Sequence, residues 1–296
     1  MTTEAPATIC TDVRRQTDEP LAGTAPVARL WVLVEQPGPW GRDALTESHL
    51  PTHVGRALKE LAVDRPVRLG LIRSVGSHVD AGRGPRRLLV ARTDAGAAWL
   101  TTRRVDDVES LPRLLSVDTL LEAPAPPPDL PGEALPTPQR ALLVCTNAKR
   151  DRCCAVLGRP LAASLVRAAD HDTEVWETSH TGGHRFAPTF VSLPDGYLYG
   201  GPQAAARTLD ACRGRSSLEP AAQVAELAVL GRLGEAAPRP LDVRALGAAT
   251  ADASRWTVAA DDESFIVEVT RTRAADRPES CGKAPVARHT FTATVH

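Results

Sequence analysis

The sequence carries no surplus of charge of either sign and no long hydrophobic run. Its 35 Lys and Arg residues balance 36 Asp and Glu residues, giving a formal net charge of −1, so the basic surface typical of nucleic-acid-binding proteins is not expected. No apolar run approaches the roughly 18 to 20 residues that span a bilayer, and residues 1–20 lack the hydrophobic stretch of a secretory signal. We therefore expect a cytoplasmic protein with no nucleic-acid partner and no membrane association.

Several redox signatures are also missing. The six cysteines include no C-x-x-C pair, which is the arrangement typical of thioredoxin-type disulfide chemistry, and there is no glycine-rich fingerprint for a flavin or a nicotinamide. A chain of 296 residues, 43% of them hydrophobic, is typical of a globular protein with one large domain or two to three small ones. The sequence therefore contains no recognised motif for disulfide exchange or for binding a flavin or a nicotinamide cofactor.

The residues that can carry chemistry gather in one stretch. The stretch Cys145–His184 contains three cysteines, Cys145, Cys153 and Cys154, and the closely spaced histidine pair His180 and His184. Thiols stay reduced in the cytoplasm, so clustered cysteines indicate metal binding or redox work. The scattered cysteines are expected to be packing or surface residues: Cys10, Cys212 and Cys281.

Hydrophobic patterning in the first half predicts alternating strands and helices. The stretch 29–41 opens as a continuous apolar strand and stops at Pro-Gly-Pro. The further elements expected are a helix over 42–62, a strand over 67–74, a hairpin of 86–92 and 97–102, and a short helix over 105–115 that Pro112 breaks or kinks. The proline-rich stretch 123–139 follows and is interpreted as a linker.

The order of elements repeats after the linker. The elements expected are a strand over 140–146, a helix over 154–169, a strand over 173–179, a hairpin of 188–193 and 197–200, and a helix over 202–214. Both halves then have the order β-α-β-β-β-α, which is that of a thioredoxin-like domain with helices on both faces of a small mixed sheet. The predicted fold class is α/β, with two tandem thioredoxin-like halves.

The C-terminal part differs from both halves. A helix is expected over 216–234, capped by Ser217 and ended by Gly234, and then two strands around an Asp-Asp turn in 254–272 and a final strand in 284–296. The expected parts of the chain are a flexible tail 1–25, a first half 26–122, a linker 123–139, a second half 140–236 and a small β-rich extension 237–296.

The cysteines of the second half lie where thiolates are stabilised. Cys145 ends a strand and Cys154 begins a helix, with a polar loop containing Lys149 and Arg150 between them. Free amides at a helix N-terminus stabilise an anionic sulfur, so Cys154, together with Cys153, is expected to be prone to form a thiolate. The alternative is that the adjacent cysteines are buried packing residues.

The two histidines follow the next strand of the second half. His180 and His184 are separated by Thr181-Gly182-Gly183, and a loop with two glycines can fold so that both imidazoles point inward. Two surface histidines on a glycine loop are the alternative.

Two thiolates and two imidazoles together are typical ligands for zinc or for an iron–sulfur centre. A closed Cys₂His₂ zinc site would be structural, whereas a [2Fe–2S] cluster with mixed ligands would be redox-active. The eight residues between Cys145 and Cys154 exceed the usual two to four of a zinc knuckle, but spacing does not decide between the metals. A thiol oxidoreductase using Cys153 and Cys154 is a third hypothesis, although adjacent cysteines strain a disulfide.

Three motifs resemble the sucrase/ferredoxin-like family. They are CTNAKRDRCCAVLGRPLA from Cys145, SHTGGHRFAPTFVSLPDGYLYG from Ser179 and GTAPVARLWVLVEQPGPWG from Gly23. The resemblance covers roughly 20–235, and the second half is similar to thioredoxin-like [2Fe–2S] ferredoxins. In those proteins the helix-start cysteine is followed by Ala-x-x-Gly, a pattern that Cys154 matches and Cys153 does not.

The resemblance implies a ligand set. His180 and His184 occupy the place of a C-x-x-x-C pair, and family members with this replacement are believed to use two cysteines and two histidines. The implied ligands of a [2Fe–2S] cluster are Cys145, Cys154, His180 and His184, with Cys153 as a spare candidate. Asn147 and Ala148 stand where relatives often have His-Gly, and ligation is not expected to fail for that reason. No pair of carboxylates is placed for the glycoside chemistry that the word sucrase implies.

The first half lacks ligands at the matching positions. The loop 36–40 replaces the cysteine loop, and only His78 falls in the loop that matches the histidine pair. We interpret this half as a cluster-free copy whose Trp40 loop either packs over the cluster of the second half or is purely structural.

These observations predict an electron carrier or redox sensor rather than a stand-alone enzyme. Such a protein requires a redox partner protein, a reductase or an acceptor, which the sequence does not identify. A zinc-stabilised structural or interaction module with the same four ligands remains the alternative.

Overall fold

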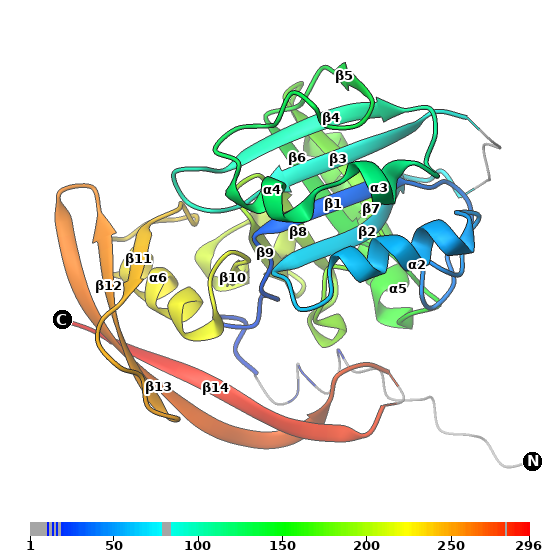
Figure 1. The fold of residues 1–296 in the computed structure, drawn as a ribbon. Coiled ribbons are helices and arrows are strands. Elements are labelled where there is room, and N and C mark those ends of the chain that lie inside the picture. The colour runs from blue at the N-terminus through cyan, green and yellow to red at the C-terminus, as the bar shows by residue number, and fades with distance from the viewer. Residues whose placement is uncertain (1–10, 12–13, 15, 17–18, 79–83, 282) are drawn as a thin grey trace, which may run out of the picture.

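The computed structural model describes residues 11, 14, 16, 19–78, 84–281 and 283–296, so most of the expected N-terminal tail lies outside the described residues. The chain forms a ten-stranded mixed sheet and a four-stranded antiparallel sheet, with helices packed on both (Figure 1). This is the mixed α/β architecture expected from the alternating pattern. Within the described part of the chain, no helix is long and apolar enough to cross a membrane.

The first half contributes five strands to the large sheet. Strand β1 pairs in parallel with β2 and antiparallel with β3, and β3 continues to β4 and β5. The elements are β1 (Leu30–Glu35), α2 (Thr52–Leu61), β2 (Val67–Ser74), β3 (Arg86–Arg92), β4 (Trp99–Val105), α3 (Leu111–Leu114), α4 (Val117–Glu122) and β5 (Glu133–Leu135). Because β5 lies inside the proline-rich stretch and pairs with the edge strand β4, this stretch is held against the first half.

The second half repeats the same pairing pattern. Strand β6 pairs in parallel with β7 and antiparallel with β8, and β8 continues to β9 and β10. The elements are β6 (Arg140–Cys145), α5 (Arg152–Ala168), β7 (Thr173–Thr178), β8 (Thr189–Leu193), β9 (Tyr197–Gly200), β10 (Cys212–Arg215) and α6 (Pro220–Arg232). The order β4-β3-β1-β2 of the first half therefore corresponds to β9-β8-β6-β7 of the second.

The two halves join through the antiparallel pair β2–β7 and stack against each other. One buried cluster combines side chains of β1 and β3, such as Leu33 and Leu89, with side chains of β6 and β8, such as Leu143 and Val191. Helices α2, α3 and α4 pack on the outer face of the first half, and α5 packs on the outer face of the second. The expectation of helices on both faces of each half was wrong, because the opposite half covers each inner face.

Several element boundaries also differ from the sequence prediction. The helix expected over 42–62 begins only at Thr52, and Pro112 lies in the first turn of the short α3 instead of kinking a longer helix. The helix expected over 202–214 is replaced by the 3-10 turns Ala204–Ala206 and Leu209–Ala211 and by β10. Bonding of β10 to the sheet edge outweighed the helical pattern of this alanine-rich stretch.

The C-terminal extension is a sheet that packs on α6. Its strands, in the order of the sheet, are β11 (Asp242–Ala245), β12 (Ala253–Ala260), β13 (Glu263–Pro278) and β14 (Pro285–Val295). Apolar residues of α6, among them Val229, pack against Trp256 and Val267 of this sheet. The N-cap of α6 is Glu219 rather than the predicted Ser217, while the left-handed Gly234 ends the helical segment as expected. The β13–β14 hairpin extends from this sheet beneath the large sheet (Figure 1).

A buried ion pair crosses the joint between the two halves. Arg73 of β2 donates to the Glu177 carboxylate of β7 at 2.8 Å, with both side chains at most 5% exposed. Thr146 and the amide of Gly76 donate to the same carboxylate. Burial would raise the pKa of Glu177, but the hydrogen bond from Thr146 and the pairing with Arg73 outweigh it and lower that pKa. The ionised pair therefore stabilises the joint at neutral pH.

The variant Glu177→Gln should lower the free energy of unfolding by about 3 kcal/mol at pH 7, because it leaves Arg73 buried without its counter-charge. The pKa of Glu177 is lowered in the folded protein, so its contribution is complete above the carboxyl's unfolded pKa and is lost as the pH falls through the folded value. The difference between the two proteins, measured by urea unfolding, should shrink below about pH 4.

Glu174→Gln is the matched control for Glu177→Gln. Glu174 lies on the same strand and pairs with Arg87, but both side chains are at least one third exposed, so the expected loss is below about 1 kcal/mol. Equal losses for the two variants would contradict the assigned role of the buried pair.

Candidate metal centre

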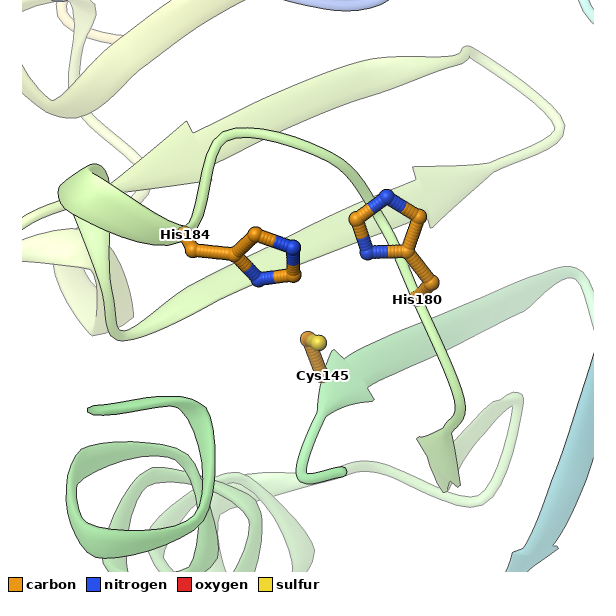
Figure 2. Close-up of side chains that lie close together, drawn as sticks. All are labelled: Cys145, His180 and His184. Atoms are coloured by element: carbon orange, nitrogen blue, oxygen red, sulfur yellow. The ribbon is translucent and has the colours of Figure 1, made fainter. Parts of the chain in front are cut away.

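Three of the predicted ligands lie close together at one end of the second half (Figure 2). Cys145 ends β6, His180 follows β7, and His184 begins the 3-10 helix η1 (His184–Phe186). One ligand atom from each of the three residues lies within 4.8 Å of the others. The two imidazole rings are stacked with centroids 4.6 Å apart. The loop with two glycines therefore turns both histidines toward the cysteine, as one reading of the sequence predicted.

Cys154 reaches the same place from the first turn of α5. Its sulfur lies 3.2 Å from His184 Nδ1, and its thiol is hydrogen-bonded to Cys145. It stands outside the tight group of three but contacts two of its members. The structure thus brings all four predicted ligands into one neighbourhood.

A close approach of α5 to the end of β6 fixes the distance between the two cysteines. Gly158 lies one turn after Cys154, and a Cβ atom at this position would collide with the backbone carbonyl oxygen of Cys145. The glycine of the Ala-x-x-Gly pattern is therefore required by packing: any side chain would push the helix away from the strand.

The loop between the histidines is held in shape by its own residues. Gly182 and Gly183 both have positive φ, at 85° and 74°, which L-residues with side chains rarely adopt. Arg213 donates to the carbonyl oxygen of Gly182, and the hydroxyls of Thr181 and Thr189 lie 2.8 Å apart. These contacts keep His180 and His184 facing each other.

The two central thiols differ in acidity, in the opposite sense to the prediction. A hydrogen bond from the Cys154 thiol lowers the pKa of Cys145, and backbone amides of Thr181 and Asn147 assist. The same hydrogen bond, with burial and the negative charge of Asp151, raises the pKa of Cys154 well above its ordinary value. The expectation for Cys154 was wrong because the Asp151 carboxylate, and not its sulfur, receives the helix N-terminal amide.

Both histidines are held in the neutral form that binds metals. Burial lowers the pKa of His184 to about 4, with the positive charge of Arg150 contributing. Burial also lowers the pKa of His180, and His184 and Arg68 add to the effect. Two buried neutral imidazoles and one acidic thiol are the chemistry of a metal-binding donor set.

Cys153, the spare candidate, faces a different partner. Its sulfur lies 3.2 Å from that of Cys281 in the loop of the β13–β14 hairpin. Asp151 joins this second group, because its carboxylate caps α5 through the amide of Cys153 and accepts hydrogen bonds from Ser280 and from the amide of Cys281. The structure thus gives Cys281 a specific partner, which the prediction of a packing or surface residue did not include.

The matching region of the first half is a structural support. Trp40 donates to the carbonyl oxygen of Gln36 and stacks on Arg73, whose guanidinium carbon lies 4.0 Å from the ring centroid. His78 approaches the Glu177 carboxylate at 3.2 Å, and Asn147 donates to the carbonyl oxygen of Gly41. The Trp40 loop therefore braces the loop that follows Cys145, in agreement with the structural alternative.

Comparison with known proteins agrees with this geometry. Residues 21–235 match the model of the sucrase/ferredoxin-like family. The chain belongs to this family. No curated protein and no solved structure gives a match. The sucrase/ferredoxin-like region includes both halves and all four predicted ligands but ends before the four-stranded sheet. Cys281, which contacts Cys153 and Asp151, therefore lies outside the family region.

Cysteine and histidine donors of this kind fit zinc or an iron–sulfur centre, so the residues present are suited to a bound metal. Sequence reasoning missed Asp151 as the residue that orders this end of the sucrase/ferredoxin-like region. Asp151 directly precedes the observed start of α5 at Arg152. An aspartate shortly before an apolar helical pattern is a recognised N-cap signal, and this signal could have identified it.

The variant Gly158→Ala tests the approach of α5 to β6. In an open helix this change stabilises a protein by up to about 1 kcal/mol, but here the new methyl group collides with the Cys145 carbonyl, and we expect a loss of about 2 kcal/mol. Urea unfolding measures the difference. Gly231→Ala in α6 is the matched control, because a Cβ atom there meets nothing within 4 Å, and it should be neutral or stabilising. Stabilisation by both changes would contradict the close contact.

Proposed function

We propose that this protein holds a [2Fe–2S] cluster through Cys145, Cys154, His180 and His184 and acts as a one-electron carrier or redox sensor. The observation that carries the proposal is the convergence of two thiols and two neutral imidazoles at one buried site, in a chain of the sucrase/ferredoxin-like family. When bound, the cluster would supply reversible one-electron exchange.

The chain's own residues would bind the cluster and limit its contact with water. Cys145 and Cys154 are at most 1% exposed, whereas His184 is 9% exposed and His180 lines a cavity that opens to the surface. We propose that the cysteine pair holds one iron and the histidine pair the other, more exposed iron. Electrons would then pass to a redox partner protein, a reductase or an acceptor, on the histidine side.

The proposal includes the nature of the fold. The two halves share one pattern of strand pairing, and we propose that they are a tandem of two thioredoxin-like units, of which the second holds the cluster and the first supports it. We also propose that the protein works in the cytoplasm, where the thiols that bind the metal stay reduced.

A zinc site is the second candidate, and one observation favours it. The donor atoms of Cys145, His180 and His184 lie within 4.8 Å of one another, and the Cys154 sulfur lies 3.2 Å from His184 Nδ1. Such short separations suit four ligands around a single tetrahedral ion. The protein would then be a structural or interaction module.

Metal and sulfide analysis of anaerobically purified protein separates the two functions. The cluster predicts two irons and two sulfides per chain with visible absorption, whereas one zinc without sulfide would contradict it. Each of the variants Cys145→Ser, Cys154→Ser, His180→Ala and His184→Ala should lose most of the metal. Cys153→Ser and Cys212→Ser are the matched controls and should keep it, because the sulfur of Cys153 faces Cys281 and that of Cys212 is buried in β10.

A further inference from the structure

A cavity of about 790 Å³ lies beside the two histidines. Its walls include residues of the segment 23–26, of the histidine loop 182–185 and of the β13–β14 hairpin, together with four arginines from elsewhere in the fold: Arg42, Arg68, Arg150 and Arg213. The hairpin lies outside the family region, so one wall of the cavity is formed by the C-terminal extension. Its size is that of a small-molecule binding site.

The cavity is lined by cations that have no carboxylate partner. Two of its arginines are neutralised, because Arg185 pairs with Glu19 and Arg288 pairs with Glu279. The lining cations that form no ion pair with a carboxylate among the described residues are Arg42, Arg68, Arg150, Arg213 and Lys283. Arg42 and Lys283 are exposed to solvent, whereas Arg68 and Arg150 are partly buried and Arg213 is buried. Partly buried positive charges without a counter-charge favour the binding of an anion.

Two of these arginines are constrained by the fold. Arg213 is fully buried and is held by the carbonyl oxygens of Thr24 and Gly182. The side chain of Arg68 forms no hydrogen bond to a described residue, and its guanidinium carbon lies 6.0 Å from the ring centroid of Trp31. Burial lowers the pKa of Arg213 to about 9 and that of Arg68 to about 10. Both guanidinium groups still remain charged at neutral pH.

A bound metal does not balance this charge. Two thiolates neutralise the dication of zinc, and they equally neutralise the doubly positive core of an oxidised [2Fe–2S] cluster, while neutral histidines add nothing. One-electron reduction of the cluster would add a single negative charge, against five unpaired cations. The surplus of positive charge therefore calls for a separate anion, whichever metal is present.

We propose that this cavity is the binding site of a small polyanion that carries two or more phosphate or carboxylate groups and lies against His180 and His184. Arginine side chains bind both groups through paired hydrogen bonds, and Arg68 approaches the histidine loop at Gly182 while Arg213 approaches it at Gly183. A ligand in this place would contact the exposed side of the metal centre and so link its charge to that of the bound anion.

Titration calorimetry on the metal-loaded full-length protein tests this proposal. The probes are pyrophosphate and citrate, titrated separately in about 150 mM KCl so that non-specific attraction is screened. We expect saturable 1:1 binding of at least one of them, and the stronger of the two identifies phosphate or carboxylate as the preferred group. Absence of binding by both up to about 10 mM would overturn the proposal.

Two variants locate the site. Arg68→Gln and Lys283→Gln should each weaken binding by about tenfold, because each removes one charged contact to the anion. Arg167→Gln is the matched control, since Arg167 lies in the last turn of α5 and does not line the cavity, and it should bind like the parent protein. Equal affinity of all four proteins for pyrophosphate and citrate would overturn the proposal. Metal content is measured on the same samples, so loss of the anion site is distinguished from loss of the metal centre.

Discussion

The buried ion pair between Arg73 and Glu177 is the constraint on which the rest of the structure depends. It lies where a strand of one half-sheet pairs with a strand of the other, over the three residue pairs of β2 and β7. Thr146, which follows Cys145, donates to the same carboxylate, and the amide of Thr146 also bonds to the carbonyl oxygen of Thr178. The chain segments that follow Cys145 and precede His180 are therefore both anchored at the Arg73–Glu177 ion pair.

The charged side chains around the candidate metal centre come from both halves. Asp151 caps α5 and contributes to the raised pKa of Cys154, while burial, assisted by cations from both halves, keeps the two histidines neutral. The first half thus contributes to the centre without ligating anything: Arg68 stands beside the cavity and Arg73 orders the cysteine loop. The strands of the first half bury one face of the second half, and its side chains contribute positive charge beside the candidate site.

The sequence was informative where local pattern decides structure. Alternating apolar segments predicted the strands of both halves, and the spacing of Cys154 and Gly158 matched a helix that must approach a strand closely. The stacking of the half-sheets could not be predicted, because a fully apolar strand has the same pattern whether a helix or another sheet covers it. The meeting of Cys153 with Cys281, 128 residues apart, and the gathering of five cations from separate strands and loops likewise depend on tertiary arrangement alone.

Pulsed EPR of the reduced protein tests the central claim most directly. If His180 and His184 are ligands of a cluster, electron spin-echo modulation should show two strongly coupled nitrogens, and the coupling of one should disappear in His184→Cys while the EPR signal of the cluster persists. Absence of strongly coupled nitrogen in the parent protein, or absence of any paramagnetic reduced state, would contradict a cluster held by two cysteines and two histidines.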